Sequence, residues 1–116
     1  MSHLYTSYET SLRLKRLGAP QEPRGGGFWA ADGHLLAMET TATPMLAHEC
    51  RAFRADEIIE ALGPILSALY QSVIGWWDVN YELLDTNLEP ISSGSIERET
   101  LVEALAAAWV AVLEAK

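Results

Sequence analysis

The chain has 116 residues, of which 49% are hydrophobic, with a single cysteine and a formal net charge of −8. This length and composition predict one domain over residues 1 to 116, with a core that needs no disulfide. There is no apolar run of roughly 18 residues and no leader-like N-terminus, so we expect neither a membrane span nor secretion. A single cysteine cannot form a Cys-x-x-Cys site. We therefore expect a cytoplasmic protein.

The acidic excess is concentrated in the second half of the chain. Residues 1–54 carry six bases and five acids, whereas residues 55–116 carry two bases and eleven acids. Phosphate backbones would repel the second half, so we expect no direct nucleic-acid binding, and basic protein surfaces are its natural partners. The alternative is that the acids only keep the protein soluble.

The N-terminal segment is predicted to form a helix over residues 7–17. Thr6-x-x-Glu9 matches a capping box, in which the hydroxyl and the carboxylate each satisfy a free backbone N–H. Gly18, followed by Pro20, is a helix stop signal.

A β-hairpin is predicted next, with strands at about 27–31 and 34–40. The dipeptide Asp32-Gly33 between them is typical of a two-residue hairpin turn. The preceding glycine run is not a phosphate-binding loop, because a strand-like segment and not a helix follows it. Residues 47–53 can form a short third strand at a sheet edge.

The middle of the chain is predicted to contain a short helix over residues 55–62, ended by Gly63-Pro64. Residues 65–74 alternate imperfectly, and the pattern leaves open whether they form a strand that pairs with residues 76–84 across Gly75 or continue the helix.

Residues 76–84 have the clearest strand pattern in the chain. Apolar and polar side chains alternate with a period of two, which is typical of a half-buried strand in an antiparallel sheet. Trp77, Val79, Tyr81 and Leu83 fall on the apolar face, and Asp78, Asn80 and Glu82 on the polar face. Trp76 departs from the pattern, because adjacent residues point to opposite sides and it is placed with the acids. The pattern does not say whether this indole is exposed.

Residues 85–95 are polar and turn-like, and a long amphipathic helix is predicted over residues 97–115. Thr100-x-x-Glu103 matches a second capping box. Together these elements predict an α+β fold: an antiparallel sheet of four to five strands with an N-terminal helix, a short middle helix and a long C-terminal helix.

The sequence gives little support for a catalytic site or for a bound metal or cofactor. His34, His48 and Cys50 are candidate metal ligands, but on one strand only His48 and Cys50 would share a face, and a stable zinc site needs three or four ligands. Acid/base catalysis by the abundant carboxylates would also require an apolar pocket to separate their pKa values. We therefore predict no enzyme activity, no cofactor and no metal.

Three segments of the chain resemble a group of small uncharacterised α+β proteins of bacteriophages and prophages. They are residues 5–12 with Leu17-Gly18, residues 76–82, and residues 99–105. The resemblance implies an α+β fold and a mobile-element setting in a bacterial host, and it carries over no functional residue.

The acids and Trp76 lead to a functional hypothesis. If the acids after residue 76 form one negative strip around the indole, they could imitate a nucleic-acid backbone and attract a basic channel. We expect a phage inhibitor of the anti-CRISPR or anti-defence type that binds a host nucleic-acid-binding protein. Its partner-binding residues would be Trp76, Asp78, Glu82, Asp85, Glu89, Glu97 and Glu99. The alternative is a small structural or accessory domain that forms a homodimer through its sheet edge or its Trp76 face.

Overall fold

The computed structural model describes residues 4–21, 27–30, 35–37 and 48–116. The chain divides into two compact units, residues 1–54 and 55–116. Among the described helices, none is long and apolar enough to cross a membrane. The predicted α+β class with three helices is confirmed in the described residues, but their strands form two three-stranded sheets where one sheet of four to five strands was expected.

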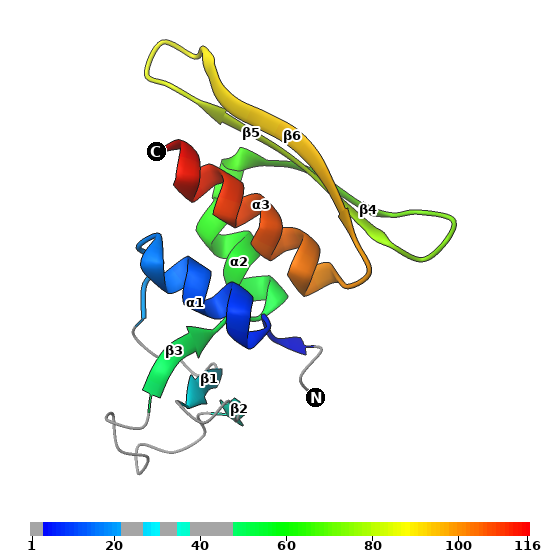
Figure 1. Cartoon of the computed structure of the whole chain (residues 1–116). Helices are drawn as coiled ribbons and strands as arrows, with labels where there is room; N and C mark the ends of the chain where they lie inside the picture. The colour runs from blue at the N-terminus through cyan, green and yellow to red at the C-terminus, as the bar shows by residue number, and fades with distance from the viewer. Residues whose placement is uncertain (1–3, 22–26, 31–34, 38–47) are drawn as a thin grey trace. The chain divides into compact units, whose positions relative to one another are not determined.

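The first unit combines helix α1 (Tyr8–Arg16) with a small antiparallel sheet (Figure 1). Its strands are β1 (Gly27–Ala30), β2 (Leu35–Ala37) and β3 (His48–Ala52), in the order β2-β1-β3. The strand predicted over 47–53 is confirmed and lies at a sheet edge, and β1 pairs with β2 antiparallel as the hairpin required. The predicted Asp32-Gly33 turn lies outside the described residues.

Helix α1 begins one residue later than the capping box predicted. Ser7 is the N-cap, and its hydroxyl accepts a hydrogen bond from the backbone N–H of Thr10 at 3.3 Å. The prediction that Thr6 caps the helix is wrong, because Thr6 is fully buried and its hydroxyl bonds elsewhere. The predicted end is confirmed: Gly18 has a φ of +98°, and the N–H of Ala19 bonds back to the carbonyl of Leu14 at 2.9 Å. Helices commonly end in this way, with a glycine in the left-handed region just after the last turn.

Thr6 ties the N-terminal segment to β3 and β1. Its hydroxyl accepts a bond from the N–H of Phe53 at 3.0 Å and shares one with the hydroxyl of Ser11 at 2.6 Å. Its N–H donates to the carbonyl of Phe53, and its own carbonyl accepts from the indole Nε1 of Trp29 at 3.0 Å. The Ser11 hydroxyl also lies 3.3 Å from the Thr6 carbonyl, so the polar groups of this buried residue are all bonded inside the unit.

We expect Thr6→Val to destabilise the protein by about 1–3 kcal/mol, because it leaves the buried N–H of Phe53 without its acceptor. Urea unfolding measures the change. The variant Ser11→Ala, alone and combined with Thr6→Val, completes a double-mutant cycle. A coupling energy near zero would contradict a direct Thr6–Ser11 interaction.

The second unit is a three-stranded antiparallel sheet with two helices. Its elements are α2 (Ala55–Leu62), a 3₁₀ turn (Gly63–Ile65), β4 (Leu66–Gln71), β5 (Trp77–Leu84), β6 (Pro90–Arg98) and α3 (Leu101–Ala115). The strands follow the order β4-β5-β6, so β5 is central, and each neighbour is joined to it by a short turn.

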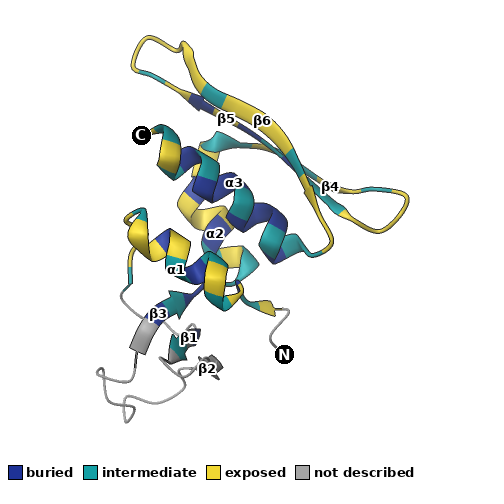
Figure 2. Cartoon of the chain, in the orientation of Figure 1, coloured by how far each residue is buried: buried dark blue, intermediate teal, exposed yellow. Residues whose placement is uncertain are grey.

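One face of this sheet is covered by helix α3, which contacts both β5 and β6 and also packs on α2 (Figures 1 and 2). The side chains of Val79, Tyr81 and Leu83 are buried on this face, as the period-two pattern predicted. Helix α3 contributes most of the remaining core through Val102, Ala104, Leu105, Ala106, Ala108, Trp109, Val110 and Val112.

Three sequence predictions are resolved or corrected in this unit. Residues 66–71 form a strand, which settles the alternatives left open for residues 65–74. The prediction that residues 85–95 form only a turn is wrong from Pro90 onward, because this stretch pairs along β5. The terminal helix begins at Leu101 and not at 97, and Thr100 caps it by accepting a bond from the N–H of Glu103 at 3.3 Å.

Candidate functional site

The second sheet has a polar face opposite the one that α3 covers, and we call it the open face. Partners in an antiparallel pair point to the same side, so the registers of β4, β5 and β6 define its members. They are Ala68, Tyr70, Asp78, Asn80, Glu82, Ser93, Ser95 and Glu97. Much of this face is accessible, and Figure 2 shows β6 exposed along most of its length.

One row across the open face places two carboxylates opposite each other. Asp78 of β5 pairs with Glu97 of β6 on one side and with Tyr70 of β4 on the other. The hydroxyl of Ser95 donates a hydrogen bond to Oδ1 of Asp78 at 2.7 Å. Like charges placed directly opposite on a sheet are destabilising, and the hydrogen bond from Ser95, which is made to a charged group, offsets that repulsion for Asp78.

The bases of the second unit do not neutralise this row. Residues 55–116 contain only Arg98 and Lys116. Arg98 pairs with Trp77, on the covered side of the sheet, and its guanidinium donates to the backbone carbonyl of Glu97 at 2.8 Å. The open face is therefore negative.

Trp76 lies at the end of the β4–β5 hairpin, just before β5, and it is 38% exposed. The hairpin closes with a bond from the N–H of Ser72 to the carbonyl of Trp76 at 2.8 Å. At its turn Val73 is fully exposed and Ile74 is 68% exposed. We call Val73, Ile74 and Trp76 the apolar tip, and it borders the row that contains Asp78.

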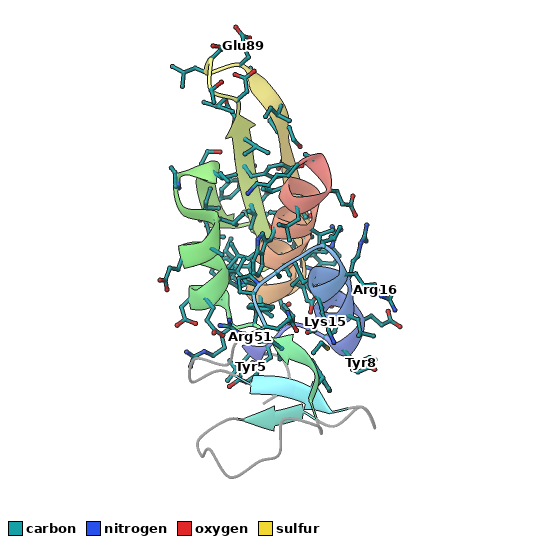
Figure 3. All side chains as sticks on the ribbon, turned by 90° about the vertical axis from the view of Figure 1, so that its left-hand side faces the viewer. Tyr5, Tyr8, Lys15, Arg16, Arg51 and Glu89 are labelled. Atoms are coloured by element: carbon teal, nitrogen blue, oxygen red, sulfur yellow. The ribbon has the colours of Figure 1, made fainter. Side chains whose placement is uncertain are left out.

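The predicted partner-binding acids do not form one continuous strip. Asp78, Glu82 and Glu97 share the open face, whereas Glu99 lies in the connection from β6 to α3. Glu89 lies at the tip of the β5–β6 hairpin (Figure 3), and Figure 1 shows this hairpin at the opposite end of the sheet from the β4–β5 hairpin.

Asp85 is engaged in the β5–β6 turn itself. Its carboxylate oxygen Oδ1 accepts bonds from the N–H of Asn87 at 2.8 Å and from the N–H of Glu89 at 2.9 Å. In this turn Leu88 adopts a φ of +62°, which is uncommon for a residue with a side chain. The carboxylate of Asp85 therefore has a structural role in this turn, which accounts for an acid at this position without a binding partner.

Gly94, in the middle of β6, is held under an aromatic ring. It pairs with Tyr81, and a Cβ placed at this position would lie 3.1–3.3 Å from the ring and hydroxyl of that tyrosine. A side chain here would displace the ring of a buried core residue, so the close packing of Tyr81 requires glycine at this position.

The residues considered for metal binding or catalysis add little to this surface. His34 lies outside the described residues, and Cys50 is buried in β3. Within the described part of the chain, no three His, Cys, Asp or Glu side chains are grouped so that they could hold a metal ion.

Sequence reasoning missed several residues of this region, among them Tyr70, Val73, Ile74 and Ser95. Tyr70, Val73 and Ile74 fall in the stretch whose secondary structure was left open, and Ser95 falls in the stretch predicted to be a turn. The sequence had offered Gly75 as the turn of a possible hairpin, and the apolar pair Val73-Ile74 directly before it was the signal that could have marked an apolar tip.

No protein-family model, curated protein or solved structure matches the chain.

Proposed function

We propose that this protein binds a host nucleic-acid-binding protein through the open face and the apolar tip, and that it blocks the partner's basic surface. It would act in the cytoplasm of a bacterial host as a phage or mobile-element inhibitor of the anti-CRISPR or anti-defence type. The proposal assigns it no catalytic activity and no cofactor.

The observation that carries the proposal is the pair of facing carboxylates, Asp78 and Glu97, on an accessible sheet face. Their repulsion costs folding free energy, and a neutral pair at the same positions would avoid that cost. Local choices that oppose stability are expected at functional positions. A basic partner would relieve the repulsion on binding, so the cost in the free protein becomes a gain in the complex.

The apolar tip supports a protein as the partner. Exposed apolar side chains grouped at one place mark interaction sites, and tryptophan is enriched among the residues that dominate binding energy. Trp76 would anchor the contact while the neighbouring carboxylates speed association with a positive surface. Net negative charge of the same unit disfavours nucleic acid itself as the ligand.

The test is an affinity pull-down from a nuclease-treated bacterial lysate with the tagged protein as bait. Parallel samples are washed at low and at high salt and analysed by mass spectrometry. We expect a nucleic-acid-binding protein that is retained at low salt and lost at high salt, because screening weakens contacts between exposed charges. Recovery of a partner without a basic surface, or of one whose retention does not depend on salt, would contradict the proposal.

A further inference from the structure

Strand β6 (Pro90–Arg98) is an edge strand whose outer side has no partner in the described part of the chain. The direction in which its backbone N–H and C=O groups point can be deduced from the β4–β5 hairpin. There the N–H of Ser72 bonds to the carbonyl of Trp76, so the backbone groups of Trp76 point toward β4. Backbone groups alternate along an antiparallel strand, so Trp77, Val79 and Tyr81 direct theirs toward β6.

The partners of those three residues, Arg98, Ile96 and Gly94, therefore bond back to β5. Ser93, Ser95 and Glu97 must direct their backbone N–H and C=O groups away from the sheet. The contact from the Arg98 guanidinium to the carbonyl of Glu97 agrees with this assignment. No described residue bonds the outward backbone groups of Ser93 or Ser95, and both residues are exposed.

The outer edge of β6 lacks the features by which proteins protect such edges. Charged residues, prolines and bulges normally prevent pairing with another chain. In β6 they occur only at the ends, as Pro90, Glu97 and Arg98, and the stretch from Ile91 to Ile96 has no charge and no proline. The opposite edge strand, β4, is shorter at six residues and has an irregular register between Leu66 and Ala68.

We propose that β6 pairs antiparallel with β6 of a second copy of this chain, which joins two three-stranded sheets into one. Two copies that each carry a net charge of −8 repel each other, so they can pair only along an uncharged stretch, and residues 91–96 supply one. The residues around the centre of this stretch, Ser93, Gly94 and Ser95, are small.

A register centred on Gly94 satisfies the outward groups of both copies. It places Ser93 opposite the second copy's Ser95, so that these two residues exchange N–H···O bonds across the two-fold axis. In the same register Glu97 lies opposite the second copy's Ile91, and the two Glu97 carboxylates are kept at opposite ends of the paired strands.

The proposal needs no host protein and is tested on the purified chain. Size exclusion with light scattering is run at a series of protein concentrations. At the highest concentrations the measured mass should be twice the chain's 12.8 kDa. Hydrogen exchange should show the N–H groups of Ser93 and Ser95 protected only where the dimer is populated, whereas those of Gly94 and Ile96 are protected throughout.

Ser93→Pro removes one outward donor and leaves the bonds to β5 in place, and Ser93→Ala is its matched control. We expect the proline variant to weaken the dimer by roughly tenfold for each hydrogen bond lost, and the alanine variant to dimerise like the parent. A monomer at every concentration would overturn the proposal. So would a dimer that survives Ser93→Pro, or one that is lost in Trp76→Ala, since that result would assign the contact to the apolar tip.

Discussion

Reversing two charges on the open face, Glu82→Lys with Glu97→Lys, is expected to weaken binding of the host protein on the order of 100-fold, about 3 kcal/mol. Both side chains are exposed on the same face of the sheet. Each lysine replaces an attraction to the basic partner by a repulsion. Titration calorimetry with the protein recovered in the pull-down measures the loss of affinity. Most of this loss should come from a slower association rate at low salt.

The matched control is Glu60→Lys with Glu114→Lys, which makes the same change in net charge on helices α2 and α3. Both positions lie near helix C-termini, where cations are favourable, and urea unfolding of the control measures what the interaction lost at Glu114 costs. We expect its affinity to fall by less than about threefold. Equal losses in the two double variants would mean that net charge alone controls binding, and the open face would then have no special part.

Shortening one buried side chain of helix α3, by Leu105→Ala, is expected to lower the free energy of unfolding by about 3 kcal/mol. Leu105 is fully buried, and its truncation removes apolar contacts and leaves a cavity, which costs about 2–5 kcal/mol in comparable cores. Natural domains are stable by only about 5–15 kcal/mol, so this is a large fraction of the total. Urea unfolding followed by circular dichroism measures the change.

Leu113→Ala, near the end of the same helix, is the comparison because Leu113 is only partly buried. We expect it to cost about 1 kcal/mol or less. Similar losses for the two variants would indicate that the second unit does not pack around the middle of α3. Neither substitution touches the open face, so the affinity of the folded protein for its partner should be unchanged in both.

These two experiments separate the open face of the second sheet from the face that helix α3 covers. Along β5, Val79 and Tyr81 are buried under the helices while Asp78 and Glu82 point to the open face. Loss of stability without loss of affinity should follow changes on the covered face, and the reverse should follow changes on the open face.

Much of the fold could be predicted from local patterns. The period-two alternation over residues 77–84 identified the central strand and its buried face. Stop signals located the ends of α1 and α2, and Thr100 was recognised as a cap of α3. These features depend on the geometry of a few neighbouring residues, and for that reason they can be read without knowing the rest of the structure.

Strand β6 could not be predicted in the same way. Its sequence is rich in serine and contains proline and glycine, which have low strand propensity. Pairing with β5 overrides that preference, and the ring of Tyr81 covers the position where Gly94 has no side chain.

The candidate site was determined partly by sequence and partly by tertiary structure. The sequence by itself determined that the second half of the chain is acidic, and it predicted that Trp76 falls on the polar side of the central strand. Only the tertiary structure decided that Glu97 lies opposite Asp78, that Asp85 is engaged in a turn, and that Val73 and Ile74 extend the apolar tip. Strand register brings together residues far apart in the sequence, and the hydrogen bonds that set it form only when both strands are in place.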